Sequence, residues 1–115
     1  MPIKSISRGI EDAIDFRAGD TIFRTGEGAD VMFYVVDGEV EIRWNDRVLE
    51  VVGPGEIMGE LAMVDDSPRS ATAVAKTDCK LAGISREHFK MLVQRNPVFA
   101  LEVMRVMADR LRRET

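Results

Sequence analysis

The sequence predicts a mainly β domain of the α+β class, in which a compact antiparallel β sandwich or barrel over residues 13–85 precedes two C-terminal helices over residues 86–115. Short apolar runs recur between turn residues at intervals of about 8 to 12 residues, the pattern of an all-β domain. After Ser85 the spacing of apolar residues changes to the period of a helix. The length of 115 residues fits a single domain, residues 1–115.

Strands are expected where apolar and β-branched residues cluster between turns. The predicted strands are residues 13–16, 21–23, 31–36, 39–44, 48–52, 71–75 and 80–84. Tight turns are expected at Asp37-Gly38, Asn45-Asp46 and Gly53-Pro54-Gly55, because these residue types tolerate turn conformations. In the strand 39–44, Val40, Ile42 and Trp44 alternate with charged residues, which predicts one face in the core and one in water.

The two helices differ in how much apolar surface they carry. Ser85 is a candidate N-cap for the first helix, and Asn96-Pro97 is expected to end it. The second helix, from about residue 98 to 113, is apolar at more positions than one buried stripe requires. The surplus predicts a second burial partner: the same helix of another copy in a homodimer, an unknown effector protein, or a ligand that the helix covers.

Composition and charge exclude several classes of protein. A net charge of −4 argues against direct nucleic-acid binding, which rests on many basic residues facing phosphates. The single cysteine, Cys79, excludes an intramolecular disulfide and a metal site built from several thiolates. The chain has no apolar leader and no apolar run of about 18 residues, so we expect neither secretion nor a membrane span, and a cytoplasmic location.

The most distinctive segment is residues 55–75, GEIMGELAMVDDSPRSATAVA. Gly59 lets backbone N–H groups approach a ligand, and Gly-Glu-Leu-Ala at 59–62 is expected to open a short helical turn. Arg69 is the only cation in the segment, and its planar guanidinium can hold a phosphate with two hydrogen bonds. The segment therefore predicts a pocket for one small anion. A surface ion pair between Glu60 and Arg69 is the alternative interpretation.

These residues resemble the phosphate-binding cassette of cyclic-nucleotide-binding domains, a family that includes bacterial catabolite activators and kinase regulatory subunits. The resemblance rests on Gly-Glu-Leu-Ala at 59–62 and Pro-Arg-Ser-Ala-Thr at 68–72. Upstream residues follow the family spacing at Phe16, Gly19, Asp20, Ile22, Phe23, Gly26, Asp30, 33–36, Gly38 and Val40. The resemblance covers about residues 13–111 and implies an antiparallel double-stranded β-helix, a jelly-roll-like β-roll over 13–85 that carries the cassette at 55–75.

The resemblance also implies a set of ligand-binding residues. The cyclic phosphate would be held by the Arg69 guanidinium, the Ser70 hydroxyl and backbone N–H groups around Gly59, Leu61, Ala62 and Ala71. Glu60 would accept a hydrogen bond from the ribose 2′-hydroxyl, because a carboxylate only accepts. Arg110 falls where bacterial members carry an arginine of the last helix near the nucleotide. Ser70 resembles the bacterial type and leaves the choice between cAMP and cGMP open.

Further residues complete the expected binding site. The apolar wall against the purine is expected to draw on Val51, Ile57, Met58 and Ala73. A cupin-type roll with a catalytic metal is disfavoured, because such sites use several histidines and this chain has only His88. Asp65-Asp66-Ser67 is interpreted as a solvated loop and not as a cation site. We therefore expect no metal and no cofactor beyond the cyclic nucleotide ligand.

The expected function is a regulatory sensor that binds cAMP or cGMP and signals through movement of the last helix. Because the chain carries no nucleophile–base pair and no metal cluster, we expect a binding protein and not an enzyme. Two alternatives stay open. One is a ligand-free module of the same fold that serves protein interaction or dimerisation. The other is the sensory half of a transcription regulator that has been truncated.

Overall fold

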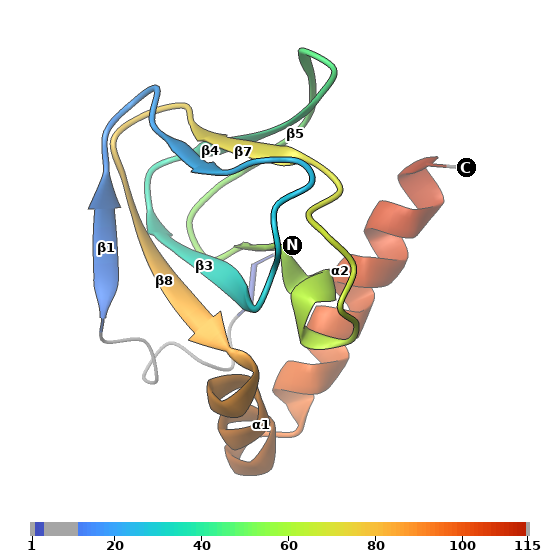
Figure 1. Cartoon of the computed structure of the whole chain (residues 1–115). Coiled ribbons are helices and arrows are strands. Elements are labelled where there is room, and N and C mark those ends of the chain that lie inside the picture. The colour runs from blue at the N-terminus through green and yellow to red at the C-terminus, as the bar shows by residue number, and fades with distance from the viewer. Residues whose placement is uncertain (1, 4–11, 115) are drawn as a thin grey trace.

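Two four-stranded antiparallel sheets and two helices make up this computed structural model, which describes residues 2–3 and 12–114 (Figure 1). The first sheet joins β1 (Ala13–Phe16), β8 (Cys79–Ser85), β3 (Val31–Asp37) and β6 (Ile57–Met58), in that order. The second joins β2 (Thr21–Phe23), β7 (Thr72–Ala75), β4 (Val40–Trp44) and β5 (Arg47–Val52). Strands distant in sequence therefore pair within each sheet, which confirms the predicted β-roll followed by helices.

Turn chemistry sets the hairpin between β4 and β5. Asn45 and Asp46 both have positive φ, 48° and 63°. Two consecutive left-handed residues match the right-handed twist of strands joined by a two-residue turn, and Asn and Asp tolerate that region. Trp44 consequently lies opposite Arg47. The turn predicted at 45–46 is confirmed, and it places Trp44 at the hairpin end of β4.

The buried side chains form two separate cores. The core inside the roll, between the two sheets, consists of Phe23, Val35, Val40, Val52, Met58, Ala73, Ala75, Cys79 and Leu81. The second core lies between the first sheet and the helices, and consists of Ile3, Met32, Ile57, Ile84, Leu92, Phe99, Val103 and Val106. Alternation along β3 explains the division, because Met32 and Val35 reach different cores from one strand. The helices are thus fixed to the outside of the roll.

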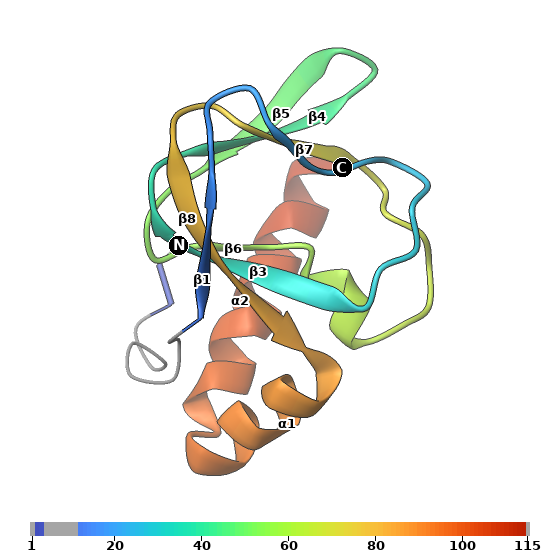
Figure 2. The ribbon, with the colours of Figure 1, turned by 60° about the vertical axis from the view of Figure 1, so that its left-hand side comes forward.

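Helix α1 (Arg86–Arg95) begins as expected, because the Ser85 hydroxyl accepts a hydrogen bond from the backbone N–H of His88 at 3.1 Å. Helix α2 (Val98–Glu114) then runs back along the roll (Figure 2). Phe99 in its first turn is fully buried and lies 5.4 Å from Phe89, centroid to centroid. From this anchor at its N-terminal end, α2 passes the short helical turn η1 (Glu60–Met63), and Arg110 in its C-terminal half reaches Glu50 of β5.

Some element boundaries differ from the predictions. Strand β6 was not predicted, because two residues are too few to show a periodic pattern; it pairs with Phe33 and Tyr34 of β3. The alternation predicted for β4 holds at Val40, which is fully buried, but Trp44 is 48% exposed. The hairpin extends beyond the core at that point. Trp44 therefore faces an open cavity and not packed side chains.

The described residues contain no helix that is both long and apolar enough to cross a lipid bilayer.

Candidate functional site

A cavity of about 930 Å³ opens between the second sheet, η1 and the C-terminal half of α2. This volume lies in the range of pockets that hold small molecules, about 300–1,000 Å³. Most of its wall is apolar, and the charged side chains that reach it are Arg47, Glu50, Glu60, Asp65, Arg69, Arg110 and Arg113. The sites predicted from residues 55–75 and from α2 therefore lie around one cavity.

Gly59 sets the backbone at the entrance to η1. Its φ is 71°, in the left-handed region that side chains rarely adopt. A Cβ at this position would collide with Nη1 of Arg69 and would lie 3.6 Å from the ring of Phe23. Glycine is thus needed for the conformation and for the close approach of the arginine. The backbone turn and the cation are packed directly against each other.

Arg69 is held by its backbone and by its side chain. Its N–H donates to the carbonyl of Glu27, and its carbonyl accepts from the N–H of Gly26, both at 2.8 Å. Its guanidinium carbon lies 4.2 Å from the centre of the Phe23 ring, and Nη2 donates to the carbonyl of Val31 at 2.7 Å. The side chain is only 8% exposed. These contacts fix a cation beside the cavity.

The hydrogen-bonding capacity of Arg69 is not used up. A guanidinium has five N–H donors. Besides the bond to Val31, Nη1 makes one long contact of 3.4 Å to the carbonyl of Gly59, and the buried Nε has no partner within the described residues. Burial lowers the pKa of Arg69, and the charges of Asp30, Glu27 and Glu60 offset part of that effect. An anion in the cavity would relieve both the unmet donor and the cost of burying the charge.

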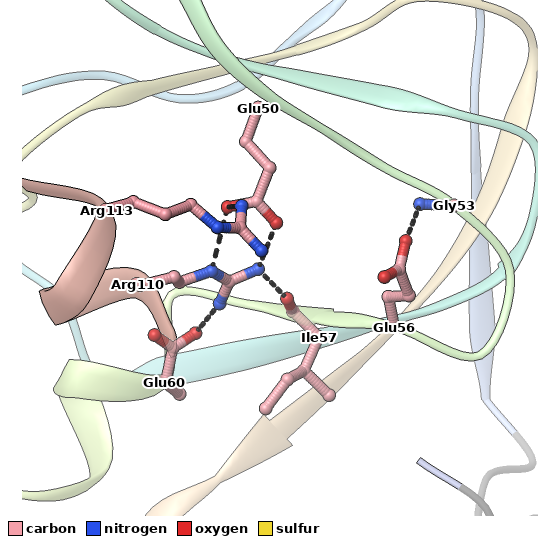
Figure 3. Close-up of polar contacts among 7 residues, drawn as sticks. All are labelled: Glu50, Gly53, Glu56, Ile57, Glu60, Arg110 and Arg113. Carbon is pink, nitrogen blue, oxygen red and sulfur yellow. Dashed lines mark hydrogen bonds and ion pairs between the residues drawn. The ribbon is translucent and has the colours of Figure 1, made fainter. Parts of the chain in front are cut away.

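Glu60, the second charged residue of the cassette, is also buried, but it does not form the alternative ion pair with Arg69. Its Oε1 accepts from Nη1 of Arg110, which reaches it from α2 (Figure 3). Arg110 also donates to both oxygens of Glu50 at 3.0 Å and to the carbonyl of Ile57 at 2.6 Å. Arg110 therefore links α2 to β5, β6 and η1 at one point.

The electrostatics of this cluster favour the charged form of Arg110. Burial by itself lowers the pKa of Arg110, but the hydrogen bond to Glu50 and the charges of Glu60 and Glu50 outweigh it, so the pKa is raised overall. Arg113 adds a second cation, with Nη1 3.3 Å from Oε1 of Glu50. The two carboxylates and two guanidiniums balance. Arg110 was predicted to lie near the nucleotide. It lines the cavity and donates to Glu50, Glu60 and the carbonyl of Ile57.

The remaining predicted site residues, Leu61, Ala62, Ser70 and Ala71, also line the cavity. The N–H of Ala62 donates to the carbonyl of Gly59 at 3.2 Å. The N–H of Leu61 comes before this first hydrogen bond of the turn and takes no part in the hydrogen bonds of the turn. Beyond the turn, Arg86 holds the loop, donating to the carbonyls of Ala62 and Asp65 at 2.8 Å. The cassette is thus tied to α1 as well as to α2.

The predicted purine wall is mostly wrong. Of its four residues only Met58 lines the cavity. Ile57 belongs to the core under the helices, Ala73 belongs to the core between the sheets, and Val51 is exposed and absent from the lining. The apolar wall comes instead from Phe23, Ile42, Trp44, Leu49, Met107 and Leu111.

A β-bulge explains two of the residues that the sequence did not reveal. Leu49 and Glu50 are consecutive in β5, yet both line the cavity. The register between β4 and β5 shifts between Ile42 and Arg43, so that Ile42 lies opposite Glu50 and Arg43 lies opposite Val48. An extra residue in one strand interrupts the alternation of side chains and redirects them. A purely alternating pattern would have put Leu49 and Glu50 on opposite faces.

The described residues contain no group of three or more His, Cys, Asp and Glu side chains arranged to hold a metal ion. The cavity instead combines a buried cation, a buried carboxylate and an apolar wall. That set can bind a molecule with one anionic group, a hydrogen-bond donor and a flat apolar part.

Comparison with known proteins shows which family this chain resembles. Residues 13–96 match the model of the cyclic nucleotide-binding domain. The CRP-like cAMP-activated global transcriptional regulator of Mycobacterium tuberculosis is 30% identical over 105 residues, covering 87% of this chain and 47% of the regulator. A cAMP-dependent protein kinase regulatory subunit of Aspergillus fumigatus is 42% identical over 88 residues, covering 71% of this chain and 20% of the subunit.

Solved structures agree with these relatives. The catabolite activator protein of Thermus thermophilus superposes with a TM-score of 0.80 at 32% identity, covering 90% of this chain and 51% of that chain. A structure from work on a cyclic-GMP-dependent signalling pathway that regulates bacterial phytopathogenesis has a TM-score of 0.80 at 28% identity, covering 96% of each chain. The chain spans about half the length, or less, of the curated relatives named above. It belongs to the cyclic nucleotide-binding domain family, whose relatives here are regulators and regulatory subunits.

Proposed function

We propose that this chain binds cAMP or cGMP as a regulatory sensor and signals through movement of α2. The observation that carries the proposal is Arg69, a buried cation with an unpartnered Nε beside a cavity of about 930 Å³. A cyclic nucleotide supplies one phosphate charge, one ribose hydroxyl donor and one flat base. These three features match the cation, the carboxylate and the apolar wall described above.

Each residue has a proposed role. Arg69 neutralises the phosphate and gives it two hydrogen bonds, supported by the Ser70 hydroxyl and by backbone N–H groups around Gly59, Leu61, Ala62 and Ala71. Glu60 accepts from the ribose 2′-hydroxyl. The base lies against Trp44 and Leu49, with Met107 and Leu111 of α2 on the other wall of the cavity. Because α2 supplies part of that wall, a bound base changes the contacts of the helix. That difference is what shifts the helix position.

The proposed activity is binding without conversion. The relatives are a transcriptional regulator and a kinase regulatory subunit, and both are named for cAMP, whereas a similar solved structure is named for cyclic GMP. These names support the ligand class and leave the base open.

Thermal melting with cAMP, cGMP and AMP tests the proposal. At 100 times its dissociation constant, a ligand of the native state adds about 2.7 kcal/mol, roughly 10 °C in melting temperature for a domain of this size. We expect a cyclic nucleotide to raise the melting temperature. AMP, whose phosphate carries a second charge and is not closed into a ring with the ribose, should have little effect. Equal shifts for all three, or none, would contradict the proposal.

Self-association through α2 is a second candidate function, because the helix presents apolar side chains to solvent. Leu101 and Met104 are each more than half exposed, and their spacing of three residues places them on one face. We propose that a second copy covers this face. Met104→Glu should lower the mass measured by sedimentation to that of a monomer, whereas Met91→Glu, on the exposed side of α1, should not. A wild-type chain that sediments as a monomer would exclude the dimer and leave an effector protein as the partner.

A role as the sensory half of a DNA-binding regulator is favoured by the relatives. The matched regulator of Mycobacterium tuberculosis is about twice the length of the matched region, and its name describes transcriptional regulation. Sequencing the gene past codon 115 tests this role. An in-frame segment with a helix-turn-helix pattern would support it, and an immediate stop codon would exclude it.

A further inference from the structure

The guanidinium of Arg110 presents two different edges to two carboxylates (Figure 3). Glu50 takes the edge formed by Nε and Nη2: Nε donates to Oε1 and Nη2 donates to Oε2, each at 3.0 Å. Nη2 also donates to the carbonyl of Ile57. Only Nη1 is left for Glu60, and it bonds Oε1. Glu60 lines the cavity, and its Oε2 has no hydrogen-bond partner in the part of the chain that the structure describes.

We propose that Glu50 is a positioning residue for the ribose of the ligand. Glu50 occupies the edge formed by Nε and Nη2 and so fixes the orientation of the guanidinium. In that orientation the carbonyl of Ile57 takes the other N–H of Nη2, and Arg110 makes a single hydrogen bond to Glu60 through Nη1. The second oxygen of Glu60 is thereby kept available to the ribose 2′-hydroxyl. This inference rests on the proposed function, in which Glu60 is the ribose acceptor.

The chemistry of arginine explains why a second carboxylate is needed. An arginine beside one carboxylate prefers two parallel hydrogen bonds, which engage both carboxylate oxygens. With Glu60 as its only anion, Arg110 would be free to adopt that arrangement, and both oxygens of Glu60 would then bond Arg110. Glu50, from β5, holds the guanidinium by its Nε–Nη2 edge and so keeps it from turning that edge toward Glu60. Nη1 of Arg113 lies 3.3 Å from Oε1 of Glu50 and balances the charge that Glu50 adds. The side chain of Glu50 is 18% exposed, so its pairing with Arg110 is well shielded from water.

Calorimetric titration of wild type and Glu50→Gln with cAMP and with its 2′-deoxy analogue tests the inference, using cGMP and its analogue if cGMP binds more tightly. Wild type should prefer the ribose form by roughly tenfold, the effect of one hydrogen bond to a charged group. In Glu50→Gln that preference should fall to about one, because only the ribose form loses an interaction. The ratio of the two affinities is unaffected by a smaller folded fraction, which scales both equally.

Two further variants sharpen the test. Glu41→Gln is the matched control. The side chain of Glu41 is 17% exposed, it pairs with Arg43 of the same strand, β4, and it does not line the cavity, so the ribose preference should persist. Glu50→Asp keeps the charge but withdraws it by one methylene, and should give an intermediate preference.

The outcomes separate the inference from the function beneath it. Equal weakening of both ligands by Glu50→Gln, or no change in the preference, would overturn the positioning role alone. A wild type that binds both forms with equal affinity would overturn the positioning role as well, because Glu60 would then not accept a hydrogen bond from the 2′-hydroxyl. A wild type that binds neither form would refute the proposed function and the inference together.

Discussion

The guanidinium of Arg69 lies over the ring of Phe23, with its central carbon 4.2 Å from the ring centre. Phe23 in turn stacks on Phe33, with 6.1 Å between the centroids and 22° between the planes. A desolvated arginine–aromatic contact of this kind is worth about 2 kcal/mol. Among the described residues no carboxylate forms an ion pair with Arg69, so the two rings and the carbonyl of Val31 keep the cation in place. Its positive charge stays available to a ligand.

Gly59→Ala should damage both the fold and the site. The new Cβ collides with Nη1 of Arg69, and alanine at φ 71° is strained by about 1–2 kcal/mol. Urea unfolding should show that loss, and ligand affinity should fall because Arg69 is displaced. Gly28→Ala is the control, because no atom lies within 4 Å of its Cβ. Wild-type stability and affinity in Gly59→Ala would show that the turn does not need glycine.

Arg110→Met should destabilise the domain by about 3 kcal/mol, because it leaves the buried carboxylate of Glu60 without its partner. Urea unfolding measures this loss. Arg112→Met lies on the same helix at a side chain that is 80% exposed, and should change stability by less than about 0.5 kcal/mol. Similar losses in the two variants would mean that the contacts of Arg110 do not hold α2 to the roll.

Trp44 should report ligand binding directly. It is the only tryptophan, it is half exposed, and it lines the cavity. A base lying against it should change its fluorescence intensity as cyclic nucleotide is added. Trp44→Ala should weaken binding by about 1–3 kcal/mol, the usual worth of a base–aromatic contact. Val48→Ala, an exposed residue of the same hairpin that is absent from the lining, should leave affinity unchanged. Unchanged fluorescence at saturation would place the base elsewhere.

The thiol of Cys79 should react slowly with alkylating reagents in the folded protein, and its burial should make the free energy of unfolding fall at alkaline pH. Burial raises the pKa of its thiol, and the charges of Asp78, Asp20 and Asp37 add to that effect. The folded state therefore disfavours the thiolate, so this contribution to stability is present below the unfolded pKa of about 8.5 and is lost as pH rises above it. Iodoacetamide should label the native protein on the order of 100-fold more slowly than the urea-unfolded protein. Rapid labelling in both states would show that Cys79 is not buried in solution.

The half of the cavity around Arg69 was predictable from the sequence because its parts are local. Gly59, Glu60 and Arg69 lie within one segment, and each has a residue-specific property: positive φ, a buried carboxylate and a planar cation. The strands and helices were predictable for the same reason, since turn residues and the N-cap at Ser85 act over a few positions. Local sequence patterns therefore predicted the roll, the helices and the segment 55–75.

The half of the cavity around Trp44 was not predictable because it depends on long-range geometry. Trp44, Leu49 and Glu50 reach the cavity through the pairing of β4 with β5 and the bulge between them. A one-residue change of register moves each side chain to the opposite face of the strand, and no local pattern in residues 47–52 predicts the bulge. The pairing of Arg110 with both Glu50 and Glu60 likewise joins residues 60 and 50 positions apart. Such contacts exist only once the roll has closed.

The most direct test of the account is a calorimetric titration of Arg69→Ala with the cyclic nucleotide that stabilises the wild type best. Loss of a charge-assisted phosphate contact should cost about 2–4 kcal/mol, roughly 30- to 1,000-fold in affinity. Arg43→Ala, which removes an arginine outside the cavity lining, should bind as the wild type does. An Arg69→Ala variant that folds and binds with wild-type affinity would contradict the claim that this buried cation receives the phosphate.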